Sequence, residues 1–128
     1  MPAPTDAKDP RLARGRAAED AAARFLERQG YELIARNVWL CGAELDLVAR
    51  DGDTVVFVEV RSRSHRRFGS PVETVGFRKA VRVARAAQAF LSLRGWSGRP
   101  ARFDVVGVDW TPSGARCTLV RAAFESPF

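Results

Sequence analysis

The chain has 128 residues, of which 46% are hydrophobic and 28% charged, and a formal net charge of +6. The sequence has no apolar stretch long enough to cross a bilayer, no secretory hydrophobic segment and only two cysteines, which argues against a membrane-spanning or disulfide-rich protein. The basic excess favours a polyanionic partner such as nucleic acid, because binding releases counterions from the phosphates. We therefore expect a cytoplasmic protein with no membrane partner.

The first half of the chain predicts a tail, a helix and a three-stranded segment. Residues 1–9 are expected to be a disordered tail, and residues 10–128 a single domain. A helix should begin at Pro10, with Asp9 as its N-cap, and end near Gly30. Three strands are predicted after it, the last two joined by a tight turn at Asp51-Gly52. They cover residues 31–38, 44–50 and 54–61.

The second half predicts a basic loop, a helix and two strands. The loop covers residues 62–69. Ser70-Pro71-Val72-Glu73 has the pattern of a capping box, and the helix that it opens should extend to about Leu93. The last strands are predicted over residues 102–110 and 116–124. The order helix, three strands, helix, two strands predicts an α/β fold with a mixed central sheet of about five strands between two long helices.

Acidic residues collect on one face of the predicted hairpin. A two-residue turn at Asp51-Gly52 pairs Asp46 with Phe57 and makes Asp46 and Glu59 diagonal neighbours, with Cβ atoms roughly 7 Å apart. Carboxylates this close repel each other unless a cation lies between them, and Mg²⁺ takes such oxygen ligands. The predicted acidic face carries Glu44, Asp46, Glu59 and Arg61, and the opposite face carries Leu45, Leu47 and Ala49.

Two alternatives to a metal site remain open for these acids. They can lie on a solvated sheet face, or Glu59 can form an ion pair with Arg61. A solvated face is the weaker alternative, because the run from Val55 to Val60 is hydrophobic on both faces apart from Glu59, as in a central strand. A buried acid in such a strand needs a partner.

Each predicted helix carries one charged residue within its apolar stripe. On the first helix Glu19 falls among Leu12, Ala22, Ala23 and Leu26, and on the second Lys79 falls among Val72, Val75, Val83, Ala86, Ala87 and Phe90. Since both helices must pack on the sheet, Glu19 and Lys79 are expected to converge on the Asp46/Glu59 site. A Glu19–Lys79 ion pair, a pair of Lys79 with another acid, or snorkelling of Lys79 to solvent would be the alternatives.

Several short motifs of the chain resemble those of the YraN family over residues 14–110. They are Gly42-Ala43-Glu44-Leu45-Asp46-Leu47, Phe57-Val58-Glu59-Val60-Arg61-Ser62-Arg63, Arg102-Phe103-Asp104-Val105-Val106, Gly15 with Glu19, Phe68-Gly69-Ser70-Pro71, and Lys79. The YraN family in turn looks like a branch of the restriction-endonuclease-like nucleases, which include archaeal Holliday-junction resolvases. The resemblance therefore implies a restriction-endonuclease-like core.

The same resemblance implies a metal-dependent nuclease that hydrolyses phosphodiester bonds, with DNA favoured over RNA and with branched or single-stranded substrates as options. Asp46 and Glu59 would hold Mg²⁺ or Mn²⁺ together with the backbone carbonyl of Val60. The implied catalytic residues are Asp46, Glu59, Arg61, Glu19 and Lys79. Nucleic acid is expected to contact Arg63, His65, Arg66, Arg67, Arg78, Arg82 and Arg85. His65 is the only histidine, so a histidine-rich zinc site is excluded.

Arg61 departs from the pattern of these nucleases, which have lysine at that position. Arginine stabilises negative charge but cannot deprotonate water, because its pKa is too high. Lys79 would supply the missing ammonium group if it points inward. The main alternative is a non-catalytic nucleic-acid-binding module on the same fold. A protein-interaction role through Trp39, Trp96 and Trp110 is the third, and a homodimer is an option because resolvase-like relatives are dimers.

Overall fold

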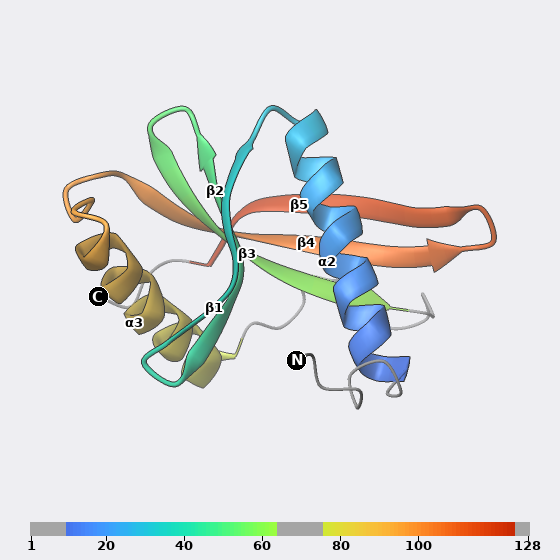
Figure 1. The fold of residues 1–128 in the computed structure, drawn as a ribbon, viewed down its shortest axis with the longest axis horizontal. Coiled ribbons are helices and arrows are strands. Elements are labelled where there is room, and N and C mark those ends of the chain that lie inside the picture. The colour runs from blue at the N-terminus through green and yellow to red at the C-terminus, as the bar shows by residue number, and fades with distance from the viewer. Residues whose placement is uncertain (1–9, 64–75, 125–128) are drawn as a thin grey trace, which may run out of the picture.

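Five strands form one mixed sheet with a helix on each face (Figure 1). The structure is a computed structural model that describes residues 10–63 and 76–124. The element order is helix, three strands, helix, two strands, which confirms the predicted α/β fold. The elements are α2 Pro10–Arg28, β1 Glu32–Leu40, β2 Ala43–Asp51, β3 Thr54–Arg63, α3 Phe77–Leu93, β4 Ala101–Thr111 and β5 Gly114–Phe124.

The sheet order is β1-β2-β3-β4-β5, so β3 is the central strand. β3 pairs in parallel with β4 from Val55–Ala101 to Arg63–Asp109, whereas the other neighbours are antiparallel. Residues 55–58 of β3 are all buried because a helix covers each face at this point. The hydrophobic run therefore marks a central strand, as its composition indicated.

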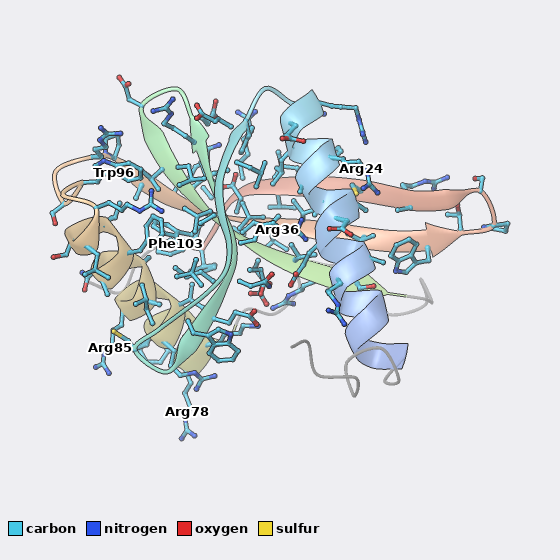
Figure 2. The ribbon with its side chains drawn as sticks, in the orientation of Figure 1. Arg24, Arg36, Arg78, Arg85, Trp96 and Phe103 are labelled. Carbon is cyan, nitrogen blue, oxygen red and sulfur yellow. The ribbon has the colours of Figure 1, made fainter. Side chains whose placement is uncertain are left out.

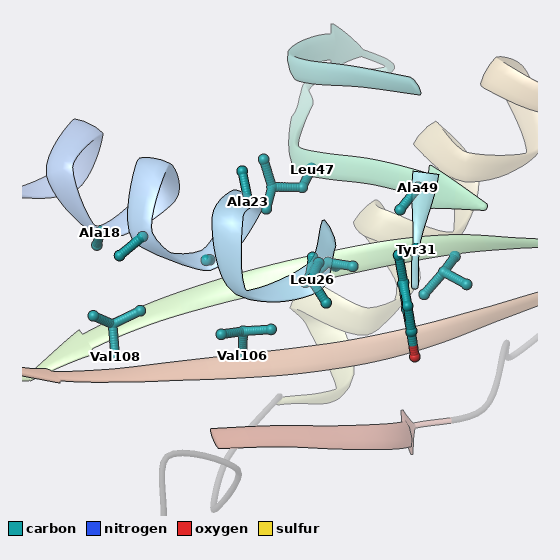
Figure 3. Close-up of a cluster of buried hydrophobic side chains, with 12 residues drawn as sticks. Ala18, Ala23, Leu26, Tyr31, Leu47, Ala49, Val106 and Val108 are labelled. Carbon is teal, nitrogen blue, oxygen red and sulfur yellow. The ribbon is translucent and has the colours of Figure 1, made fainter. Parts of the chain in front are cut away.

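Helix α2 packs on one face of the sheet through small residues (Figure 3). Ala18, Ala22 and Leu26 are buried against Leu47 of β2 and Val106 of β4. The short alanine side chains let the helix lie close to the sheet, which also brings the polar residues of α2 near the strands.

Helix α3 packs on the other face around an aromatic cluster. The ring of Phe57 lies 5.9 Å from that of Phe90 on α3 and 5.7 Å from that of Phe103 on β4, as measured between centroids. Val83, Ala86 and Ala87 are also buried there, and they belong to the stripe predicted for this helix.

The predicted start of the second helix was wrong. Helix α3 begins at Phe77, because Gly76 at its N-cap is extended, with φ −63° and ψ 156°. Apart from proline, glycine has the lowest helix propensity, because it loses the most backbone entropy in a helix. A helix that begins after Gly76 avoids this cost. The capping box at 70–73 and the predicted stripe residues Val72 and Val75 lie outside the described residues, as do the tail 1–9 and the side chain of Leu12.

The register of the β2–β3 hairpin also differs from the prediction. Asp51 pairs with Thr54, so the two-residue turn is Gly52-Asp53, and glycine supplies the positive φ of 62°. Leu47 pairs with Val58, which shifts every predicted pair by two residues. A shift of two leaves the faces unchanged for the paired residues 47–51, and the predicted pair of Asp46 with Phe57 is not formed, because the pairing ends at Leu47–Val58.

Within 10–63 and 76–124, no helix is long and apolar enough to cross a membrane.

Candidate functional site

The sheet opens at Asp46. Pairing between β2 and β3 ends at Leu47–Val58, and from there β3 pairs with β4 alone. On its other side, β2 pairs with β1 at Leu47 and Leu45 but skips Asp46 and Asn37. Asp46 therefore lies where the β1–β2 hairpin separates from the rest of the sheet.

The break changes the faces of the neighbouring residues and corrects a prediction. Leu47 and Ala49 pack on the α2 side, whereas Leu45 lies on the α3 side together with Val48. The three residues predicted to share one face do not, because the alternation of β2 resets at Asp46. Irregularities of this kind re-aim side chains, and they are common beside active sites.

Asn37 connects two acids across this break. Its backbone has a positive φ of 52°, a conformation that asparagine tolerates better than most residues. Its side-chain Nδ2 donates hydrogen bonds of 2.9 Å to Glu19 Oε1 on α2 and to Glu44 Oε2 on β2. One amide group thus holds two carboxylates from separate elements.

Three carboxylates gather at this point, those of Glu19, Glu44 and Asp46. One oxygen of each lies within 4.8 Å of the others. Glu19 reaches the group from α2, which confirms that this residue points at the sheet near Asp46. The three are called the acidic cluster below.

The surroundings of Asp46 raise the pKa of its carboxyl group. Burial is the largest cause and Glu59 the second, with smaller contributions from Glu19 and Glu44, and together they raise the pKa of Asp46 to about 7. A hydrogen bond of 2.9 Å from the backbone N–H of Val60 to Asp46 Oδ2 opposes this shift but does not cancel it. The site therefore has an excess of negative charge that a proton or a cation relieves.

The carboxylate of Glu59 lies next to two cations. Its Oε2 forms an ion pair with Lys79 Nζ of α3, and Arg61 Nε lies 3.9 Å from the same oxygen. The Glu59 side chain is only 11% exposed, whereas that of Lys79 is 44% exposed. Lys79 thus points at the sheet as predicted, and of the alternatives it forms the ion pair with another acid, Glu59.

An open groove of about 210 Å³ gives access to these groups. It is lined by the acids Glu44, Asp46 and Glu59, by the cations Lys79 and Arg82, and by Trp39, Gly42, Ala43 and Val83. Arg78 and Arg85 are exposed on the same helix and project outward from it (Figure 2). Carboxylates and cations that line one groove suit a metal ion and a phosphate side by side.

Comparison with known proteins places this arrangement in a family. Residues 18–108 match the family model described as "Uncharacterised protein family UPF0102". The chain belongs to the UPF0102 family.

Curated UPF0102 proteins from several bacteria match this chain almost end to end. One from Symbiobacterium thermophilum is 48% identical over 113 residues, covering 88% of this chain and 96% of that protein. One from Pseudomonas savastanoi pv. phaseolicola is 49% identical over 115 residues, with 88% and 93% covered. One from Pseudomonas aeruginosa is 46% identical over 117 residues, with the same coverage. Residues 18–108, which match the family model, contain every residue of the acidic cluster and also Asn37, Glu59 and Lys79.

The residues predicted for the UPF0102 site fall into three groups in the structure. Glu19, Asp46, Glu59, Arg61 and Lys79 are brought together, and Val60 meets Asp46 through its backbone N–H. Arg82 lines the groove, whereas Arg78 and Arg85 lie exposed on the same helix. His65, Arg66, Arg67 and the side chain of Arg63 lie outside what the structure describes.

Glu44 and Asn37 were not predicted as site residues. Glu44 was placed on the acidic face of the hairpin, which was the available signal, but the metal was assigned to Asp46, Glu59 and the backbone carbonyl of Val60. Asn37 gave no signal, because its role depends on a positive φ and on a gap in pairing that hydrophobic alternation does not reveal.

Trp96 and Trp110, two of the three tryptophans considered for protein contacts, pack on the hydrophobic clusters. Trp96 also lies 6.3 Å from the ring of Phe90, and Trp110 Nε1 donates to Ser62 Oγ. Trp39 is different, since it is 68% exposed.

Proposed function

We propose that this UPF0102 protein is a metal-dependent nuclease that hydrolyses phosphodiester bonds, with DNA as the favoured substrate. The observation that carries the proposal is the acidic cluster with its raised Asp46 pKa, next to the Glu59–Lys79 pair. It agrees with the restriction-endonuclease-like core that the motifs imply and with the order of the elements.

The residues present fit a hard divalent cation such as Mg²⁺ or Mn²⁺. All three groups of the cluster are carboxylates, the ligands that these ions prefer. An ion would be held by Asp46 with Glu44 and Glu19, and Glu59 would join if Lys79 moves to a phosphate. When bound, it would supply Lewis-acid polarisation of the phosphate and a nucleophile at neutral pH.

The side chains of the chain itself have separate tasks in this proposal. The backbone N–H of Val60 fixes one oxygen of Asp46, and Asn37 fixes Glu19 and Glu44, so the ligands are preorganised. Lys79 Nζ holds Glu59 and is near enough to the groove to meet an entering phosphate. Arg61 stabilises charge on that phosphate but does not accept a proton.

Arg61 supports a second candidate function, a non-catalytic nucleic-acid-binding module. The side chain lies beside Glu59 where the related nucleases have lysine. In this alternative the acidic cluster binds a cation or a proton without hydrolysis, and the cations on α3 hold the phosphates.

Cleavage of labelled nucleic acids would separate the two functions. Purified protein would be incubated with single-stranded, duplex, flapped and four-way-junction DNA and with RNA, in Mg²⁺, Mn²⁺ or EDTA. We expect cleavage that requires metal and is lost in Asp46→Asn and Glu59→Gln. Asp20→Asn is the matched control, because Asp20 is adjacent to Glu19 on α2 but pairs with Arg36.

Metal binding would be measured in the same proteins by calorimetric titration with Mn²⁺. Saturable binding that is lost in Asp46→Asn and kept in Asp20→Asn supports the site, whatever the activity. Binding of nucleic acid without cleavage would favour the module. If the wild type bound neither metal nor nucleic acid, both functions would be contradicted.

A further inference from the structure

Trp39 is an exposed aromatic residue beside the acidic cluster. It is 68% exposed, yet it lines the same groove as Asp46, Lys79 and Arg82. A tryptophan side chain normally buries most of its large apolar surface. Its exposure among charged groups indicates a ligand that has both a flat apolar face and negative charge.

The backbone holds Trp39 next to the cluster. Trp39 and Glu44 are direct partners in the β1–β2 ladder, so the indole projects from the strand position opposite one of the acids. The hairpin that carries both residues closes with a two-residue turn at Cys41-Gly42, whose φ values of 53° and 75° are typical of a tight type I′ turn. The ring is therefore attached to a short, well-defined hairpin.

A nucleotide has the required combination of properties. Its base offers a flat face for the indole, and its phosphate offers charge for Lys79 and Arg82. Stacking on aromatic side chains beside cations is how proteins bind single strands without reading sequence. In a duplex, the faces of the bases are already covered by their neighbours, so only an unpaired base is available.

We propose that Trp39 is a stacking platform for an unpaired nucleobase beside the phosphate that enters the groove. The substrate class is then single-stranded nucleic acid, or the unpaired part of a branched one. This inference rests on the proposed function, since it assumes that nucleic acid enters this groove.

A protein partner fits the surroundings of Trp39 less well. The cores of protein interfaces are depleted of charged residues. Here the indole shares its groove with Glu59, Lys79 and Arg82, and the last of these is exposed. Loss of a dimer in Trp39 variants is therefore the outcome that would assign the residue to a protein contact.

Fluorescence anisotropy with labelled DNA would test the stacking role. Wild type, Trp39→Leu and Trp39→Phe would be titrated against a mixed-sequence single strand and a duplex of equal length, in EDTA to prevent cleavage. We expect Trp39→Leu to weaken single-strand binding about tenfold and duplex binding less than twofold, with Trp39→Phe in between. Phe77→Leu is the control, because Phe77 is 76% exposed but does not line this groove.

The outcomes separate this inference from the proposed function. Metal-dependent cleavage by the wild type with unchanged single-strand affinity in Trp39→Leu would overturn the stacking role alone. Single-strand binding that depends on Trp39, without cleavage, would support the stacking role and contradict the nuclease. Equal losses for single strand and duplex, or a dimer that dissociates in Trp39→Leu on size-exclusion chromatography, would also overturn it.

Discussion

Asp46 and Asp104 lie on neighbouring parts of one sheet but have opposite surroundings. Asp104 is fully buried, and it accepts hydrogen bonds from Arg102 Nε at 3.0 Å, Tyr31 OH at 3.1 Å and the backbone N–H of Ala122 at 3.0 Å. Asp46 is only partly buried; among the described residues it accepts a hydrogen bond from the backbone N–H of Val60 and faces three other carboxylates. The two acids differ in the balance of charge and hydrogen-bond donors around them, and burial alone does not reveal that difference.

The Asp104 side of this comparison is a closed network. Arg102 Nη2 also donates to Asp51 at 2.9 Å and to Tyr31 OH at 2.6 Å. Burial lowers the pKa of Arg102, but the hydrogen bonds to Asp104 and Asp51 outweigh it and raise that pKa above its ordinary value. Each charge has an opposite partner, so we expect the network to stabilise the fold.

The largest expected effect is on this closed network. We expect Arg102→Leu to lower the free energy of unfolding by about 3–5 kcal/mol, because it leaves Asp104 charged and buried without its cation. Arg50→Leu is the matched control, since Arg50 pairs with the exposed Glu32 and should cost under about 1 kcal/mol. Urea unfolding followed by circular dichroism would measure both. Equal decreases in the free energy of unfolding of the two variants would mean that the buried network contributes no more than a surface ion pair.

Lys79 tests the open side of the comparison. We expect Lys79→Met to reduce the single-turnover cleavage rate about 100-fold, the usual cost of removing one charge-stabilising donor. Saturating protein removes any effect of weaker binding, and Arg82→Met controls for loss of a groove cation that does not pair with Glu59. Activity that survives in Lys79→Met would limit the lysine to holding Glu59.

The pH dependence of the free energy of unfolding would test the raised pKa of Asp46. Its pKa is raised to about 7 in the folded state, from 3.8, so between these values the folded protein keeps a proton that the unfolded chain releases. Stability should therefore fall as pH rises through this window, by at most about 1.4 kcal/mol per pH unit, and level off above pH 7. The slope should be smaller in Asp46→Asn, measured in EDTA by urea unfolding from pH 5 to 8. Identical slopes in the wild type and Asp46→Asn would contradict a raised pKa of Asp46.

The sequence predicted much of this site, and the reasons are physical. An acid and a lysine in apolar helical stripes, Glu19 and Lys79, had to point at the sheet, and they do. What the stripes did not reveal is that the helices lie on opposite faces and meet the same site only because the sheet opens at Asp46. That opening coincides with the positive φ of Asn37, and neither feature is visible in the pattern of hydrophobic residues.

Register and helix ends were the other limits. Asp51-Gly52 and Gly52-Asp53 are both plausible two-residue turns, and the choice between them moves every cross-strand pair by two. The capping pattern at 70–73 was a local signal, whereas the helix that carries Lys79 begins after Gly76. In both cases, local chemistry allowed several answers and packing selected one.

The smallest expected effects concern two exposed cations, one near the acidic cluster and one near the Asp104 network. Near the acidic cluster, Arg82 lines the groove; near the closed network, Arg99 stacks on Trp96 at 4.6 Å from the ring centroid. We expect Arg82→Gln to reduce the slope of log K against log salt for DNA binding by about 1, because one phosphate contact is lost. Arg99→Gln should leave the slope unchanged. Equal slope changes would mean that DNA is attracted by net charge over the whole surface, whereas a change confined to Arg82 would place the phosphates in the groove beside the acidic cluster.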